Sequence, residues 1–219
     1  MDNRYGRVQW GPHGARVRTS AQTWNQLRKW DRAAAKAGTR PFVFSLSLGD
    51  IWDNQVDPAW RREAFDIARE CTNLVMLYLS KRIGNAVDMA KDAGGLPANA
   101  ALGATFGSQG DYDRDRMKLF DARCRLNPLF TFGSFEPLLG PVILDKFAPD
   151  WIIVGGESGR NARLMEDDWA RSLLRQSSDL GRVFNFKQRG GRGPDKGGHT
   201  LDGKTYFDRP RPSTPAKEA

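Results

Sequence analysis

The residues of this chain that could do chemistry cluster where predicted strands end. The clearest case opens with the apolar run Trp151 to Val154 and then breaks into Gly-Gly-Glu-Ser-Gly at 155–159. A short apolar run rich in β-branched residues predicts a strand buried on both faces. Glycines directly after it allow a sharp turn and the close approach of a ligand to the main chain. We therefore predict a binding segment here. The alternative is a plain strand-to-helix turn in which Glu157 is only a solvated carboxylate.

Polar residues also follow the other predicted strands. The carboxyl ends of parallel strands face one side of a sheet, and α/β proteins place their sites there. The residues that we predict to bind a cofactor or ligand are Ser47, Asp50, Lys81, Glu136, Gly155, Gly156, Glu157, Ser158 and Lys187. Carboxylates and cations gathered where the carboxyl ends of the strands meet, at the mouth of the sheet, could hold a zwitterionic ligand or shift one another's pKa. The alternative is that they pair off as a structural ring of ion pairs. The pattern assigns no catalytic residue and no metal ligand.

Strand and helix patterns alternate about six times along the chain. Apolar runs predict strands at 40–47, 74–79, 101–106, 128–132, 151–154 and 183–186, and helical spacing predicts helices at 23–37, 57–70, 85–91, 111–124, 144–147 and 169–180. This alternation requires a parallel sheet with helices outside. Six units without an obvious switch point favour an α/β fold of the incomplete (β/α) barrel type over an open doubly wound sheet.

The chain divides into three parts by composition. Residues 1–20 form an irregular basic arm, residues 21–190 hold the partial barrel, and residues 191–219 form a basic tail rich in Gly and Pro. Tails of this composition bury little apolar surface, so we expect this one to be partly disordered.

The charge and the cysteine content indicate which partners and which cellular compartment to expect. Lys and Arg number 34 against 26 Asp and Glu, a formal net charge of +8. This excess permits weak nucleic-acid binding, and a solvated basic surface is the alternative. The two cysteines, Cys71 and Cys124, are far apart, which is typical of buried thiols in a reducing cytosol. No apolar run approaches membrane-spanning length, so we expect a cytoplasmic protein without a membrane partner.

Common catalytic and nucleotide-binding motifs are missing from the sequence. Both histidines, His13 and His199, fall in predicted loops, so no Ser-His-Asp set is indicated. The Gly-rich stretch matches neither the P-loop nor the dinucleotide fingerprint, so neither ATP nor NAD is supported.

Five segments together carry a resemblance to a known family. They are Phe-Ser-Leu-Ser-Leu-Gly-Asp at 44–50, Leu-Ser-Lys-Arg at 79–82, Phe-Glu-Pro-Leu-Leu-Gly-Pro at 135–141, the stretch 151–159, and Phe-Lys-Gln at 186–188. In this order and spacing they resemble the phage Gp37/Gp68 family, a domain of unknown function that looks like a branch of the radical SAM enzymes. The likeness spans about Val8 to Phe207. It implies S-adenosylmethionine as a cofactor.

The same resemblance implies a [4Fe–4S] cluster, for which this chain has no cysteine motif. Members usually carry the cluster-binding cysteines, ending near Cys-Tyr-Ala, before the stretch that resembles Tyr5 to Arg18. We expect either that such a segment lies upstream of Met1 or that this is a natural form without the cluster. Two interpretations therefore stay open. One is a radical SAM-like enzyme of unknown substrate, inactive as this chain stands. The other is a clusterless module that binds a small molecule at the barrel mouth, a nucleic acid or a protein. The oligomeric state stays open as well.

Overall fold

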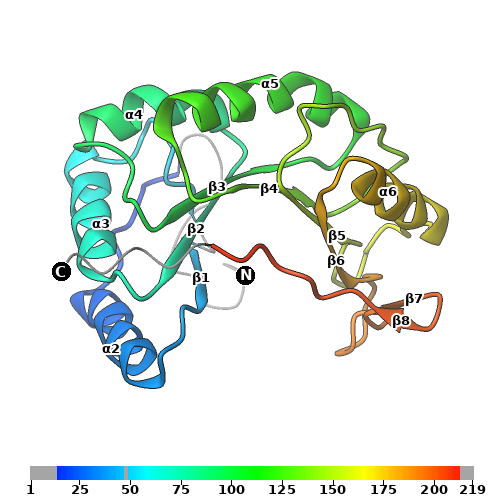
Figure 1. Cartoon of the computed structure of the whole chain (residues 1–219), viewed down its shortest axis with the longest axis horizontal. Coiled ribbons are helices and arrows are strands. Elements are labelled where there is room, and N and C mark those ends of the chain that lie inside the picture. The colour runs from blue at the N-terminus through cyan, green and yellow to red at the C-terminus, as the bar shows by residue number, and fades with distance from the viewer. Residues whose placement is uncertain (1–13, 47–48, 213–219) are drawn as a thin grey trace.

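The protein is built on a parallel sheet that curls into half of a barrel. The computed structural model describes residues 14–46 and 49–212. Six parallel strands follow one another in sequence order, β1-β2-β3-β4-β5-β6. The helices lie around the outer, convex face of this sheet (Figure 1). This arrangement confirms the predicted incomplete (β/α) barrel with about six strands and helices outside.

The elements alternate along the chain as predicted. The strands are β1 Phe42–Ser45, β2 Val75–Ser80, β3 Ala100–Thr105, β4 Thr131–Phe135, β5 Trp151–Gly155 and β6 Val183–Gln188. The helices are α2 Ala21–Ala37, α3 Pro58–Glu70, η1 Ile83–Asn85, α4 Ala86–Asp92, α5 Gln109–Leu126 and α6 Asp167–Asp179. A short hairpin, β7 Thr200–Leu201 with β8 Lys204–Thr205, follows β6.

Local sequence signals account for the helix ends. The Asp57 side chain accepts a hydrogen bond from the Ala59 N–H, and Pro58 occupies the first helical turn of α3. An acidic N-cap followed by proline is a strong start signal for a helix. Helix α2 ends at Gly38, whose φ of 62° is the left-handed conformation that glycine adopts without strain. These ends fall where the sequence predicts them.

Two predicted elements differ from the structure. The strand predicted at 128–132 lies at 131–135, because the apolar positions that enter the sheet continue to Phe135. Residues 144–147 form a turn instead of a helix. The Leu144 N–H donates to Gln176 Oε1 and the Asp145 carboxylate accepts from Tyr112. These tertiary hydrogen bonds replace the ones that a helix would make within the segment.

The two faces of the sheet carry different cores. The outer face packs against the helices through residues such as Phe135, Val154, Phe184 and Phe186. The inner face carries an aromatic cluster, which we call the inner aromatic cluster: Phe42, Phe130, Phe132 and Trp151. Their ring centroids lie 5.5 to 6.3 Å apart, the spacing of edge-to-face and tilted aromatic pairs. This cluster occupies the amino-terminal half of the concave side.

The segment after β8 covers the free edge of β6. The Phe186 N–H donates to the Tyr206 carbonyl at 2.7 Å, and Asn185 pairs antiparallel with Phe207. The Tyr206 ring packs on Phe184 with centroids 5.8 Å apart. The chain then crosses from the β6 side toward β1 (Figure 1, red). This segment therefore docks on the barrel edge, and it also spans part of the opening between the two edge strands.

Candidate ligand-binding site

Three polar side chains lie at one level across the concave face of the sheet, with Ile153 between the second and the third. The strand register places Thr105 beside Ser134, Ser134 beside Ile153, and Ile153 beside Asn185. Because side chains alternate along a strand, a residue between two outer-face residues points inward. Asn185 lies between Phe184 and Phe186, which both belong to the outer core. We call Thr105, Ser134 and Asn185 the inner polar row.

Two of the three residues in the inner polar row are largely buried, and the row has no hydrogen-bond partner among the described residues. Ser134 is 5% exposed and Asn185 is 8% exposed, whereas Thr105 is half-buried. Within residues 14–46 and 49–212, none of the three side chains forms a hydrogen bond. Their polar atoms are not among the fully buried, unpaired atoms of the described residues, so they stay open to solvent or to a ligand. Groups of this kind that face a concave surface are suited to bind a polar ligand.

An ion pair lies next to the inner polar row, closer to the carboxyl ends of the strands. Lys187 Nζ donates to Glu136 Oε2 at 2.8 Å, with Lys187 53% exposed and Glu136 17% exposed at their side chains. A Cβ added at Gly155 would lie 3.0 Å from this carboxylate. Glycine at this position therefore gives the Glu136 side chain room to lie across β5. The three predicted residues Glu136, Gly155 and Lys187 thus come together.

The Gly-Gly-Glu-Ser-Gly segment pairs with the segment after β6. The Gly156 N–H donates to the Gln188 carbonyl at 3.0 Å, and the Gly159 N–H donates to the Gly191 carbonyl at 3.1 Å. Gln188 Nε2 donates to Ser158 Oγ at 2.7 Å. A Cβ at Gly156 would lie 1.8 Å from the Arg189 carbonyl oxygen, so only glycine fits. These N–H groups serve the fold, and they are not available to a ligand carboxylate.

The Glu157 carboxylate is engaged by an arginine of its own loop. It accepts hydrogen bonds from Arg163 Nε at 2.7 Å, from Arg163 Nη2 at 3.0 Å and from the Arg163 N–H at 2.9 Å. The side-chain hydrogen bonds, followed by the backbone one, lower the pKa of Glu157 to about 2. A ligand ammonium group would have to compete with Arg163 for this carboxylate.

Asp50 and Lys81 meet at the other side of the mouth. The Asp50 carboxylate accepts hydrogen bonds from Ser80 Oγ at 2.7 Å and from the Lys81 N–H at 3.2 Å. It also accepts from the Trp52 N–H at 3.0 Å, so it ties the segment after β1 to the end of β2. The Lys81 side chain is exposed. Ser47, also predicted as a site residue, lies outside the described residues.

The predicted site residues therefore form two groups that no described hydrogen bond joins. One group lies after β1 and β2, and the other lies after β4, β5 and β6. Sequence reasoning missed Thr105 and Asn185 because it considered residues after the strands instead of those within them. The signal was present for Asn185, since a single polar residue between two phenylalanines marks the inward face.

The donor groups of the described chain do not fit an iron–sulfur cluster. Cys71 caps the end of α3 and is buried, and Cys124 lies exposed on α5. Burial raises the pKa of the Cys71 thiol and so disfavours the thiolate that binds metal. Within residues 14–46 and 49–212, no group of three or more His, Cys, Asp or Glu side chains could hold a metal ion. A cluster needs three or four thiolates, which these residues cannot supply.

Comparison with models of protein families identifies the family of this chain. A family model described as a protein of unknown function (DUF5131) matches residues 2–210. The chain belongs to this family. No curated protein and no solved structure matches the chain. Among the described residues, no helix is long and apolar enough to cross a membrane.

Proposed function

We propose that this DUF5131 protein binds a small zwitterionic molecule on the carboxyl-terminal half of its concave face, and that the molecule is S-adenosylmethionine. The observation that carries the proposal is the inner polar row. Ser134 and Asn185 are more than nine-tenths buried, without a partner among the described residues, and adjacent to an ion pair. The cofactor is the one that the resemblance to radical SAM-like proteins implies.

The residues offer complementary groups for such a molecule. The Glu136 carboxylate can accept from a ligand ammonium group, and Lys187 can bind a ligand carboxylate, because both charged side chains border the row. The Asn185 amide and the hydroxyls of Thr105 and Ser134 can both donate and accept hydrogen bonds. The described residues supply no ligands for a [4Fe–4S] cluster, so no step that depends on reductive cleavage is proposed for this chain.

Calorimetric titration with S-adenosylmethionine tests the proposal. We expect binding to the wild type and a roughly three- to tenfold weaker Kd for Ser134→Ala, because one hydrogen bond is lost. The matched control is Ser177→Ala, the same change at a buried serine whose hydroxyl donates to the Leu173 carbonyl within α6. This control should leave the Kd unchanged.

Parallel titrations with S-adenosylhomocysteine, methionine and adenosine identify the part of the molecule that is bound. The cofactor proposal is refuted if the wild type binds none of these at millimolar concentration. It is also refuted if Ser134→Ala and Ser177→Ala weaken binding equally, since the loss would then not come from the inner polar row.

A further inference from the structure

A cavity lies at the amino-terminal end of the half-barrel. It has a volume of about 890 Å³ and lies between the two edge strands. One wall is formed by the start of β1 at Arg40 to Phe42, and another by Arg182 to Phe184 at the start of β6. The segment Tyr206 to Pro212 runs along it. We call this cavity the amino-end crevice. It is separate from the inner polar row, which lies toward the carboxyl ends of the strands.

The walls of the amino-end crevice are strongly basic. Four arginines line it against one acidic residue, Asp208, and these arginines are Arg40, Arg182, Arg209 and Arg211. Arg209 and Arg211 are exposed and form no ion pair with any residue in the described ranges. Arg182 lies 3.4 Å from Asp150, to which Arg123 also binds at 2.7 Å. The local excess of positive charge therefore remains uncompensated at the C-terminal segment.

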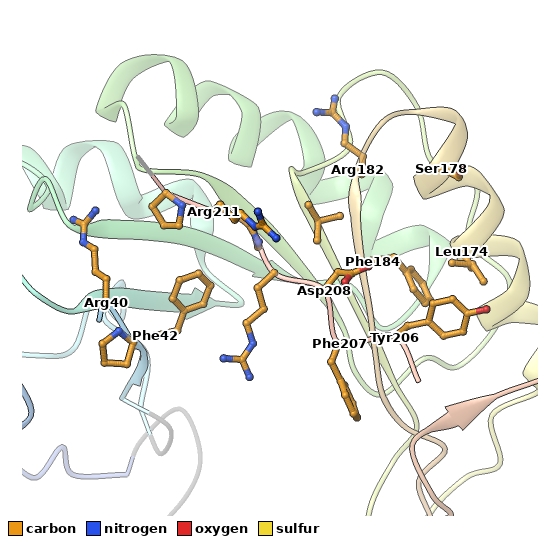
Figure 2. A pocket seen from close by; sticks show the side chains of 15 residues that line it. Arg40, Phe42, Leu174, Ser178, Arg182, Phe184, Tyr206, Phe207, Asp208 and Arg211 are labelled. Atoms are coloured by element: carbon orange, nitrogen blue, oxygen red, sulfur yellow. The ribbon is translucent and has the colours of Figure 1, made fainter. Parts of the chain in front are cut away.

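Aromatic rings stand between these arginines. Phe42 and Tyr206 line opposite walls, and Phe207 is 51% exposed. Figure 2 shows Arg40 and Phe42 on one side, Arg182 and Tyr206 on the other, and Arg211 carried between them by the C-terminal segment. Guanidinium groups bind phosphates in a planar, bidentate manner, and exposed rings stack on bases. Of these three rings only Phe207 is exposed, so Phe207 is the ring that can stack on a base beside Arg209 and Arg211.

We infer that the amino-end crevice binds single-stranded nucleic acid. The volume exceeds the roughly 300 Å³ at the small end of ligand pockets, so it can take more than one nucleotide unit. Arg209 and Arg211 are exposed and lie two positions apart on one segment, which suits successive phosphates of one strand. The net charge of +8 adds long-range attraction for a polyanion. The inference does not depend on the proposed S-adenosylmethionine site, because none of its residues is shared.

The test measures binding of the full chain to a short fluorescein-labelled oligo(dT) by fluorescence anisotropy. We expect Arg209→Gln/Arg211→Gln to weaken binding at least about fivefold at roughly 50 mM salt. The dependence of log Kd on log salt should become shallower by about 1.4, because each contact with a single-strand phosphate contributes about 0.7. Both arginines are exposed and lack ion pairs, so the melting temperature should not change.

The matched control removes two arginine charges from another part of the surface. Arg160→Gln/Arg192→Gln changes two exposed arginines near the carboxyl-terminal mouth that form no ion pair with a described residue. This variant should bind oligo(dT) like the wild type. Equal losses in both variants would overturn the inference, because the binding would then be a diffuse effect of net charge. Tighter binding of duplex DNA, competition by free thymidine monophosphate at equal nucleotide concentration, or no binding at low salt would each overturn it as well.

Discussion

Replacing Asn185 by leucine should stabilise the protein while weakening ligand binding. Asn185 is 8% exposed and its amide has no hydrogen-bond partner among the described residues. Its amide atoms are not among the fully buried, unpaired ones, so leucine removes no internal hydrogen bond and adds apolar contact. Leucine has a similar size, and it would pack against Ile153, which is next to Asn185 in the register. We therefore expect a gain of about 1 kcal/mol in the free energy of unfolding, or roughly 2–4 °C in Tm.

The same substitution at Asn99 provides a control with the opposite sign. Asn99 is 4% exposed, and its Nδ2 donates to the carbonyls of Ala68, Cys71 and Leu74 at 2.8 to 3.1 Å. Asn99→Leu removes both N–H donors of this amide, which are shared among the three carbonyls. At about 1 kcal/mol for each donor, we expect a loss of about 2 kcal/mol, or roughly 4–8 °C in Tm.

Thermal melts and titrations of both variants together decide the role of Asn185. In Asn185→Leu the Kd for S-adenosylmethionine should rise about tenfold, because a hydrogen bond to a charged ligand contributes about 1.5 kcal/mol. A loss of stability as large as that of Asn99→Leu, with binding intact, would refute the reasoning. Asn185 would then hold the fold, and the inner polar row would not be a site.

Three further results are expected. Gly156→Ala should lower the free energy of unfolding in urea by several kcal/mol, because the new Cβ would lie 1.8 Å from a backbone oxygen. The control Gly140→Ala should be neutral, because its Cβ would meet no atom within 4 Å. NMR titration of Arg163→Gln should show the Glu157 pKa rising from about 2 toward its ordinary value of 4.5. Because the pKa of Glu157 is depressed in the folded state, its ion pair with Arg163 stabilises the protein at pH values above the ordinary pKa. This contribution is lost as pH falls through about 2. An unchanged Glu157 pKa in the variant would contradict the role given to Arg163. Anaerobic reconstitution of this chain should yield less than one iron per chain, and a stoichiometry of about four would show that the ligand argument is wrong.

Elements and their order followed from local patterns in the sequence. Strands such as Trp151–Gly155 are continuous apolar runs, and α3 begins at an Asp-Pro pair, so each signal acts within a few residues. Alternation of the two element types then leads to a parallel sheet with helices outside, because the crossover between parallel strands needs a helix. That a site lies at the carboxyl ends of the strands stays a prediction, based on a general property of such sheets.

Only the tertiary structure decided which polar residues are engaged and which lack a partner. Lys187 pairs with Glu136 across 51 positions, whereas Glu157 pairs with Arg163 only six positions away. Asn99 makes three hydrogen bonds and Asn185 makes none within the described chain, although both are buried asparagines in or beside strands. The physical reason is that a side-chain hydrogen bond requires its two groups within about 3 Å. The path of the loops sets that distance, and no pattern of neighbouring residues encodes it.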